Sequence, residues 1–365
     1  MPFATTIFHT AERLFHLPLI GFDISERSIK YFKLKGGGIL SIDVFGEIEI
    51  PEGVIENGEI KKEHDLAKLI KEWSKFQPWR VRAAYPVVSL PEEKSFLRVI
   101  QLPKIKIEEV EGAIRWELEA NIPLPPDELI YDYEIIDPIE DHLDHVDVVV
   151  TAFPKTIIES YVRVFKEAGI QPYAFELESQ AIIRSAIKEL HSYDTKIIID
   201  MGLNRTSFII FSGGAIRFTE TIPLGGRIFE ENIAKTLKVT PEYALAIKKE
   251  KGLDKKAYDG ELFASLVPAM GVYADELKRA ISYYSDHAMH IHGAKAAIQQ
   301  ILLTGGDANL LGLDTYLAGK LKIPVERADP FISLHDRMTH TILPIPKNAA
   351  LAFSTAIGLA LRAIR

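Results

Sequence analysis

Two segments far apart in the chain repeat an arrangement that suits the binding of phosphate. Residues 19–28 (LIGFDISERS) and 197–206 (IIIDMGLNRT) each predict a buried strand ending in aspartate, a tight turn, and a hydroxyl residue that opens a return strand. Small residues in a turn let backbone N–H groups approach phosphate oxygens, and a carboxylate at a strand end holds Mg²⁺ through water. We therefore expect two hairpins, carrying Asp23 and Asp200, that hold a polyphosphate between two lobes.

A third segment, residues 301–309 (ILLTGGDAN), predicts a strand, two glycines, and a helix that opens at Asp307 or Ala308. Gly305 and Gly306 would let a flat base lie against the backbone, and a helix N-terminus favours anionic groups. Each segment alone is weak evidence, because such turns are common. The three in this order, at domain-scale spacing, favour a nucleotide-binding fold built from a repeated unit.

Composition narrows the class of protein. The chain has 365 residues, of which 47% are hydrophobic and 26% charged, so we expect a globular protein with two or more lobes. A net charge of −8 without basic runs argues against a nucleic-acid partner. The absence of cysteine excludes disulfides and thiolate metal sites. No signal peptide or apolar stretch of about 20 residues is present, so we expect a soluble protein that meets a membrane only indirectly.

The elements that position the three segments follow from periodicity and turn residues. Residues 3–16 predict an amphipathic helix that packs on its own domain, with a location on a membrane surface as the alternative. In the first half we expect strands at 19–24, 28–35, 39–50 and 81–88, a glycine turn at 36–38, and a helix at 64–76. A separate α+β module is expected at 95–172, with strands at 96–102, 130–136 and 146–153, helices at 107–120 and 155–168, and a proline-rich corner at 122–126.

The second half predicts a hairpin followed mainly by helices. Its strands are expected at 196–200, 206–212, 215–221 and 300–304. Its helices are expected at 226–237, 241–250, 264–288, about 308–321, and 347–364.

Together these motifs resemble the superfamily of actin, hexokinase and the heat-shock chaperones, which implies a two-lobed α/β fold of the ribonuclease H-like ATPase type. Within it, Leu102-Pro103, residues 115–119 (RWELE), residues 121–125 (NIPLP) and Asp132-Tyr133 resemble the PilM family of type IV pilus assembly proteins. That family is similar to the cell-division protein FtsA, which carries an inserted subdomain in place of actin's outer one. The resemblance runs from about Pro18 to the end, where no FtsA-like membrane tail follows the last helix.

The resemblance implies a division of the chain into five parts. These are an N-terminal helix at 1–17, a first-lobe core at 18–94 and 173–194, an inserted subdomain at 95–172, a second-lobe core at 195–223 and 289–365, and a second-lobe outer subdomain at 224–288. Residues 178–181 and 356–359 resemble the two connections between lobes, and residues 223–226 resemble the turn into the outer subdomain.

The resemblance also implies a site for ATP and Mg²⁺. The residues expected at the nucleotide are Asp23, Ser25, Arg27, Ser28, Asp200, Gly202, Asn204, Thr206, Gly225, Gly226, Glu276, Arg279, Gly305, Gly306 and Asp307. Asp23 and Asp200 would hold Mg²⁺ through water, and Glu178 would orient an attacking water in what is at most a slow ATPase. A helix cap at Glu178, and a solvated helix face at Glu276, Lys278 and Arg279, are the structural alternatives.

The first hairpin departs from the family pattern, in which glycine stands two residues after the aspartate. Ser25 occupies that position, so its Cβ would lie where phosphate passes. Glu26 adds repulsion, which Arg27 would offset. This departure weakens the prediction of triphosphate binding at the first hairpin, whereas the other two segments keep their glycines.

For function, the resemblance implies a scaffold at the inner face of the cytoplasmic membrane. It would dock the N-terminal cytoplasmic segment of a PilN-like bitopic membrane protein in a groove beside the inserted subdomain, and self-association is a further option. Two rival functions stay open, an FtsA-like filament former and a small-molecule kinase. A metal site at His287, His290 and His292 is disfavoured, because only the first two share a helical face.

Overall fold

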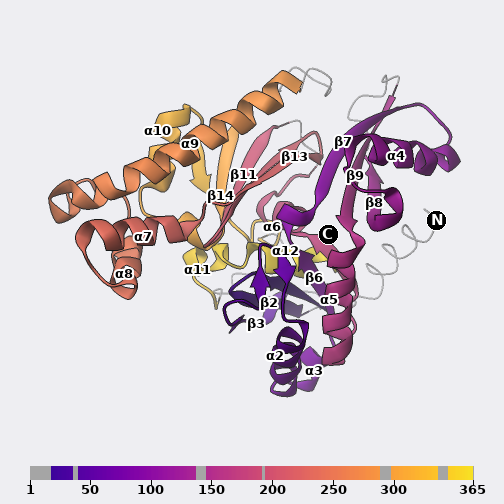
Figure 1. Cartoon of the computed structure of the whole chain (residues 1–365), viewed down its shortest axis with the longest axis horizontal. Coiled ribbons are helices and arrows are strands. Elements are labelled where there is room, and N and C mark those ends of the chain that lie inside the picture. The colour runs from indigo at the N-terminus through magenta and orange to yellow at the C-terminus, as the bar shows by residue number, and fades with distance from the viewer. Residues whose placement is uncertain are drawn as a thin grey trace. The chain divides into compact units, whose positions relative to one another are not determined.

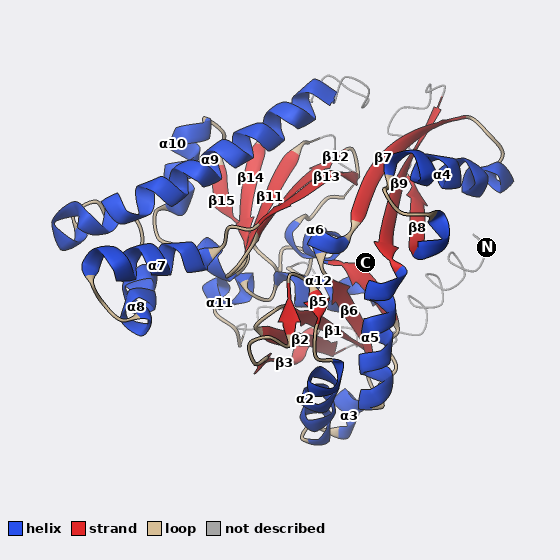
Figure 2. Cartoon of the chain, viewed as in Figure 1, coloured by secondary structure: helices blue, strands red, loops and turns tan. Residues whose placement is uncertain are grey.

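The computed structural model describes residues 18–35, 40–136, 145–190, 194–287, 297–335 and 344–364. The chain divides into two compact units, each with its own five-stranded sheet (Figures 1 and 2). Unit 1 comprises Met1–Leu190, Pro330–Pro346 and Phe353–Arg365, and unit 2 comprises His191–Asp329 and Lys347–Ala352. The predictions for residues 3–16, residues 36–38, His290 and His292 lie outside the described residues.

The sheet of unit 1 has the strand order β10-β6-β1-β2-β3. Its strands are β1 (Leu19–Ile24), β2 (Ser28–Lys35), β3 (Ser41–Glu49), β6 (Tyr85–Leu90) and β10 (Ala174–Leu177). β1 pairs antiparallel with β2 and parallel with β6. All six residues of β1 are buried, as expected for a central strand covered on both faces.

Helices cover both faces of this sheet. On one face lie α2 (Glu63–Lys75) and α5 (Lys155–Ala168), where the ring of Phe22 packs against Trp73 and Phe165. On the other face lie α6 (Glu178–Ala186) and α12 (Ser354–Ala360). A Cβ on Gly21 would stand 2.1 Å from the carbonyl oxygen of Ala356, so α12 packs directly on bare strand backbone.

Several short elements complete this part of unit 1. They are β4 (Ile55–Glu56), β5 (Glu59–Ile60), α3 (Trp79–Arg82), the 3-10 turn η1 (Glu92–Lys94), and η6 (Leu361–Ala363). The strand predicted at 81–88 was wrong at its start, because Pro78 opens α3 and the N–H of Val81 donates to the Pro78 carbonyl at 2.9 Å. Val81 is still buried, so its apolar character fits a short helix as well as a strand.

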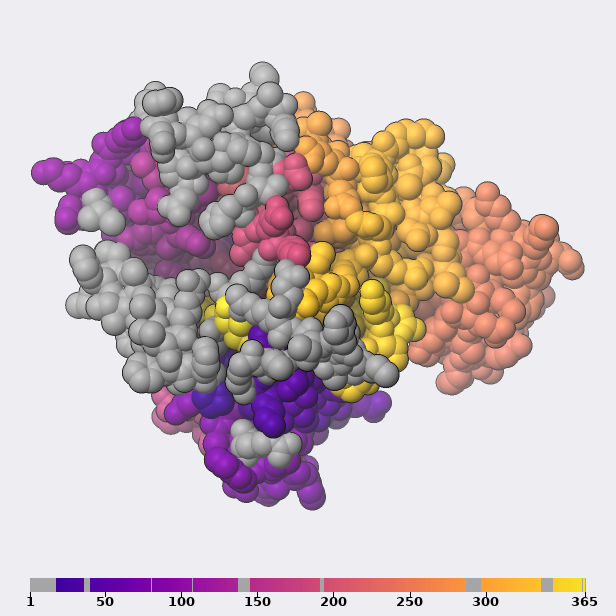
Figure 3. Space-filling view, turned by 180° about the vertical axis from the view of Figure 1, so that it is seen from behind, coloured from indigo at the N-terminus to yellow at the C-terminus, as the bar shows by residue number. Residues whose placement is uncertain are grey.

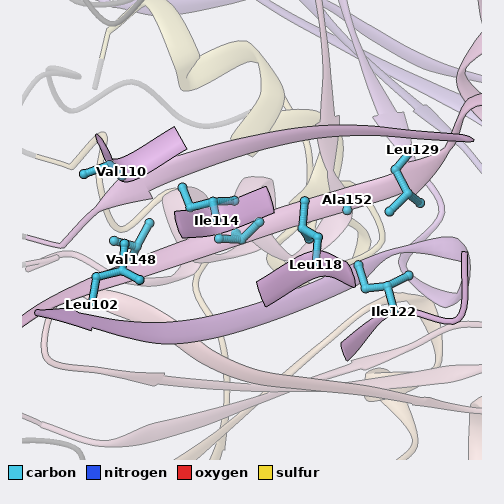
Figure 4. Packing of buried hydrophobic residues seen from close by; sticks show 9 residues of the cluster. Leu102, Val110, Ile114, Leu118, Ile122, Leu129, Val148 and Ala152 are labelled. Carbon is cyan, nitrogen blue, oxygen red and sulfur yellow. The ribbon is translucent and has the colours of Figure 1, made fainter. Parts of the chain in front are cut away.

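The α+β module within unit 1 forms a separate layer. It contains β7 (Phe96–Pro103), α4 (Ile107–Asn121), η2 (Pro126–Glu128), β8 (Leu129–Ile135) and β9 (His145–Pro154), and its sheet has the antiparallel order β7-β9-β8. Val110, Ile114 and Leu118 of α4, with Ile122 directly after it, recur every four residues and pack on one face of this sheet (Figure 4). The predicted strands and helices of this block agree with the structure to within one residue.

The sheet of unit 2 has the order β13-β12-β11-β14-β15. Its strands are β11 (Lys196–Met201), β12 (Thr206–Ser212), β13 (Ala215–Ile222), β14 (Gln300–Thr304) and β15 (Val325–Arg327). β11 pairs antiparallel with β12 and parallel with β14, which is the same pattern as β1 with β2 and β6. The repeat predicted from the two hairpins is therefore confirmed by the topology of both sheets.

The helices of unit 2 are α7 (Gly226–Leu237), α8 (Pro241–Lys251), η3 (Ala257–Gly260), α9 (Glu261–His287), η5 (Gly306–Asn309), α10 (Leu313–Leu321) and α11 (Lys347–Leu351). Among the described residues, none of the helices is both long enough and apolar enough to cross a bilayer.

Two predicted helices are broken in the structure. The helix expected at about 308–321 is η5 followed by α10, because Gly312 adopts a φ of +82° between them. The helix expected at 347–364 is α11, then α12 and η6, because Phe353 has non-helical backbone angles at the boundary between the two units. Apolar periodicity continues through both breaks, so the pattern alone did not reveal them.

Candidate functional site

The parallel strands β11 and β14 end side by side in unit 2, with Asp200 opposite Thr304. The turn after β11 is closed by the N–H of Gly202, which donates to the Arg205 carbonyl at 3.0 Å. Gly305 follows β14 with a φ of +86°, and a Cβ there would lie 2.6 Å from Asp200 Oδ1. Only glycine fits this position, and the second and third predicted segments meet there.

The turn into α7 joins the same cluster. The N–H of Gly226 donates to the Gly202 carbonyl at 2.9 Å. A Cβ on Gly225 would lie 2.3 Å from the Leu203 backbone, and one on Gly226 would lie 2.0 Å from the Asp307 carboxylate. Unit 2 thus brings the predicted glycines and Asp307 into one compact set of loops.

A buried ammonium lies under these loops. Lys248 of α8 donates to Asp307 Oδ1 at 2.5 Å, to Glu230 Oε1 at 2.5 Å, and to the Gly226 carbonyl at 3.4 Å. Burial raises the pKa of Asp307, and the Lys248 ammonium opposes that rise. Neither Lys248 nor Glu230 was predicted. The available signal was a lysine one turn after Ala244 and beside Ile247, on the buried stripe of α8.

Space remains over two of the glycines. A Cβ on Gly306 would have its nearest neighbour at 3.8 Å, in Ala352, and one on Gly202 would meet only the Arg205 carbonyl, at 3.2 Å. Bare backbone at these turns suits the close approach of phosphate oxygens or of a flat base, and the Asp200 carboxylate suits a hydrated Mg²⁺. The expected helix N-terminus at Asp307 was wrong, because η5 has four residues and ends before α10.

Two other predicted residues of the second hairpin are engaged in structure. Thr206 is fully buried, and its hydroxyl lies 2.7 Å from the Leu224 carbonyl and 2.9 Å from the Tyr273 hydroxyl. Burial raises the pKa of Tyr273, which keeps this phenol neutral. Asn204 accepts a hydrogen bond from the Arg227 guanidinium at 2.9 Å. These bonds fix the shape of the hairpin and of the turn into α7.

The first hairpin, in unit 1, is filled by side chains. Asp23 is buried at the end of β1, where Ser89 Oγ donates to its carboxylate at 3.3 Å. The N–H and the hydroxyl of Ser25 both donate to the Ser28 carbonyl, at 2.9 and 3.0 Å. The serine at the expected glycine position therefore closes the turn on itself.

The charges at this hairpin differ from those expected. Glu26 accepts the N–H of Asn57 at 2.7 Å, and Arg27 forms an ion pair with Glu52 at 3.6 Å. Glu26 was expected to repel phosphate and Arg27 to offset that repulsion. Both side chains have partners in the neighbouring loop instead. Lys30, which was not predicted, donates to the hydroxyl of Ser28 at 3.0 Å and also pairs with Glu47 at 3.3 Å. Its signal was the i+2 spacing from Ser28, which puts both on one face of β2.

Glu178 is buried at the start of α6, at the carboxyl end of β10. Its carboxylate accepts the N–H of Glu92 at 3.4 Å, while Glu92 in turn accepts the N–H of Ser179 at 3.1 Å. Glu178 lies in the first turn of α6, as the alternative of a charge at the helix N-terminus requires, and Glu92, distant in sequence, also caps this turn. The water-orienting role of Glu178 stays a prediction.

The sequence model of the family described as type IV pilus assembly protein PilM matches residues 21–364. The chain belongs to the PilM family. Among solved structures it is similar to a PilM-PilN type IV pilus biogenesis complex, with a TM-score of 0.77 and 23% identity over 96% of this chain and 99% of that chain. It is also similar to MreB 5 of Spiroplasma citri bound to AMPPNP, with a TM-score of 0.53 and 14% identity over 95% of each chain. The predicted actin-like fold is confirmed.

The PilM-family chain also has FtsA relatives. It is 25% identical over 277 residues to the cell division protein FtsA of Neisseria meningitidis serogroup B, which covers 67% of this chain and 64% of that protein. The chain therefore spans less than two thirds of the length of that relative. This likeness agrees with the predicted relation between the PilM family and FtsA.

The remaining predicted residues of this PilM-family chain lie on α9. Arg279 pairs with Glu276, and Lys278 pairs with Asp275 at 3.4 Å, which are the interactions expected of a solvated helix face. His287 is the last residue of α9. Across the part of the chain that the structure describes, no three acidic or histidine side chains are placed to hold a metal.

Proposed function

We propose that this PilM-family chain is an ATP-binding, actin-like scaffold of the type IV pilus assembly platform. It would work at the inner face of the cytoplasmic membrane, where it docks the N-terminal cytoplasmic segment of a PilN-like membrane protein. The observation that carries the proposal is the family match over residues 21–364. The actin-like fold supports the nucleotide, since MreB 5 of the same fold binds AMPPNP.

In unit 2, the residues proposed to hold ATP are the glycines and the aspartate in the loops that follow β11 and β14. The backbone of Gly202 and Gly306 would lie against the nucleotide, and Asp200 would hold Mg²⁺ through water. In unit 1, Asp23 and Lys30 would contribute charge at the first hairpin. ATP that binds one conformation of the protein more tightly than another would favour that conformation.

The sheet of the module supports the docking of a peptide. Among the described residues, its two outer strands, β7 and β8, each have one edge without a strand partner in the order β7-β9-β8. On the face opposite α4, Ile130 of β8 is 42% exposed and Val99 of β7 is half-buried, next to the buried Phe153 and Val149 of β9. An extended apolar segment can add to such an edge and place alternate side chains on such a face.

The nucleotide part is tested by calorimetric titration of ATP with Mg²⁺ into the purified full chain. Asp200→Ala should lose at least tenfold in affinity, because the carboxylate that would hold the metal is removed. Asp286→Ala, exposed near the end of α9, removes the same charge elsewhere in unit 2 and should bind like the natural chain. No binding to the natural chain at millimolar ATP would overturn this part.

The docking part is tested separately with a fluorescent synthetic peptide of the N-terminal cytoplasmic segment of PilN from the same genome. Ile130→Glu should weaken binding at least tenfold in fluorescence anisotropy, because it places a charge on the open apolar face. Trp116→Ser changes an exposed side chain on α4, which covers the other face of the same sheet. Equal losses in both variants would contradict the assigned face.

A further inference from the structure

Unit 1 carries an exposed aromatic pair between α2 and α3. Phe76 and Trp79 are 86% and 79% exposed, the two highest values among the large apolar side chains of the described residues. Figure 1 shows α2 and α3 at one end of unit 1, and this end lies at the lower margin of the view from behind in Figure 3. Adjacent large apolar side chains that the described residues leave exposed indicate an interaction surface.

The exposure is fixed by packing on the inner side of the same segment. The ring of Trp73 lies 4.8 Å from that of Phe22, and Val81 is buried. The N–H of Phe76 donates to the Trp73 carbonyl at 3.1 Å, and Pro78 opens α3. The two aromatic rings therefore project from a turn that is held by the partly buried Trp73 on one side and the buried Val81 on the other.

Cations flank the pair in sequence. Lys71, Lys75 and Arg82 are exposed, and Glu72 is the one acidic residue between positions 71 and 85. The chain as a whole carries a net charge of −8, so the sign of the charge is reversed at this end. We call Lys71, Lys75, Phe76, Trp79 and Arg82 the aromatic tip.

We infer that the aromatic tip contacts an anionic lipid bilayer. Tryptophan rings settle at the level of lipid headgroups, and lysine and arginine close to the surface are attracted by anionic lipids. Two side chains that project outward can enter a deformable headgroup layer, whereas a protein partner would need a matching pocket. The inference does not rest on the proposed binding of ATP or of a peptide. It adds a direct contact made by unit 1 to the expected association through a PilN-like membrane protein.

A second exposed tryptophan provides a matched control. Trp116 on α4 is 77% exposed, close to the value for Trp79. It is flanked by the exposed Glu111 and Glu119, and its neighbour Arg115 pairs with Asp127 at 3.1 Å. An anionic bilayer would repel this surface, so exposure alone should not bring Trp116 to lipid.

The test is sedimentation of the full chain with vesicles. We expect binding to vesicles of equal parts phosphatidylglycerol and phosphatidylcholine, weaker binding in 0.5 M NaCl because salt screens the cations, and none to phosphatidylcholine alone. The double variant Phe76→Ser/Trp79→Ser should bind at least tenfold more weakly, while Trp116→Ser should bind like the natural chain. Circular dichroism of each variant shows whether it is folded.

A second readout follows the tip directly. In a Trp116→Phe background, anionic vesicles should shift the fluorescence of Trp79 to shorter wavelength, and Trp79→Phe should abolish the shift. No binding, or equal binding to neutral vesicles, would overturn the inference. So would binding that persists in the Phe76→Ser/Trp79→Ser variant, because it would assign the lipid contact to another segment, such as residues 3–16. The titrations with ATP and with peptide contain no lipid. A lack of binding in them would therefore count against the proposed function and not against the lipid contact.

Discussion

The two hairpins share one topology but differ in the residues that form and surround their turns. In unit 2, the turn after Asp200 is bare backbone that Gly305 and Gly225 approach too closely for any Cβ. In unit 1, the turn after Asp23 is closed by the hydroxyl of Ser25. A repeated fold therefore fixes where a loop lies, while the residues in the loop decide how much backbone it offers to a ligand.

The charge clusters of the two units also differ, in the ratio of cations to carboxylates. In unit 1, Glu176 pairs with two guanidiniums, those of Arg184 and of Arg362, and Arg184 also donates to the Gly358 carbonyl at 2.8 Å. In unit 2, one ammonium, that of Lys248, serves both Asp307 and Glu230. The first cluster has more cations than carboxylates and the second has fewer, so unit 2 depends on a single side chain.

The largest effect should follow from removing that side chain. Lys248→Met leaves the carboxylates of Asp307 and Glu230 in place without their shared cation. Loss of one partner of a buried ion pair costs about 3–5 kcal/mol, and we expect that decrease in the free energy of unfolding. Urea unfolding followed by circular dichroism measures it.

The control for this variant is Lys249→Met, which removes the same charge from the adjacent exposed position. It should change stability by less than about 0.5 kcal/mol, as surface substitutions usually do. Similar losses in both variants would show that the cluster around Asp307 has no special dependence on Lys248.

The next largest effect concerns close packing at the loops. In Gly226→Ala the new methyl group would stand 2.0 Å from the Asp307 carboxylate and must displace it. Overpacking of this kind costs about 1–3 kcal/mol, and ATP binding in unit 2 should fall with it. Gly319→Ala, where a Cβ would meet nothing within 4 Å on α10, is the control and should keep or slightly raise stability.

The topology and the glycines of unit 2 were predictable from the sequence, because both depend on short local patterns. A strand ending in Asp200, a turn at Gly202 and paired glycines at 305–306 each lie within ten residues of the features that give them meaning. The predicted α7 at 226–237 agrees with the structure for the same reason, since its start at Gly226 and its end are local signals.

The residues that the sequence did not reveal depend on distant partners. Lys248 meets Asp307 across 59 positions, and Glu92 caps α6 across 87 positions. Periodicity gives the face on which a side chain lies but not what it meets there. The breaks at Gly312 and Phe353 were missed because apolar residues continue on both sides of each.

The carboxylates of Glu176 and Asp307 should respond oppositely to pH. Burial raises the pKa of Glu176 but the guanidiniums of Arg184 and Arg362 more than reverse this, so it lies below its ordinary 4.5 and its stabilisation is lost as pH falls below that value. Burial holds the pKa of Asp307 above its ordinary 3.8 despite Lys248, so its contribution is present at low pH and lost as pH rises from 3.8. Each group changes stability by at most about 1.4 kcal/mol per pH unit.

Tryptophan fluorescence separates the two responses, because Trp73, Trp79 and Trp116 all lie in unit 1. Unfolding followed by this signal should depend less on acid in Glu176→Gln, while Glu59 and Glu63, whose pKa values are also lowered, keep part of the dependence. The Asp307→Asn variant should leave it unchanged and should alter only the transition seen by circular dichroism. A change of the fluorescence profile in Asp307→Asn alone would contradict the assignment of the two carboxylates to separate units.

The smallest effects should come from exchanging the residues that distinguish the two turns. Ser25→Gly keeps the backbone bond from residue 25 to the Ser28 carbonyl but removes the hydroxyl and the Cβ, so we expect ATP affinity to rise about two- to fivefold, by less than about 1 kcal/mol. Gly202→Ser adds a Cβ 3.2 Å from the Arg205 carbonyl and should lower affinity by a similar or larger factor. Calorimetry measures the ATP affinity of both variants.

If Ser25→Gly leaves affinity unchanged while Gly202→Ser lowers it, ATP binding would depend on the loops of unit 2 and the filled turn at Ser25 would play no part. If neither changes it, bare backbone at the turns would not be what the nucleotide contacts, and the difference between the hairpins would concern stability alone.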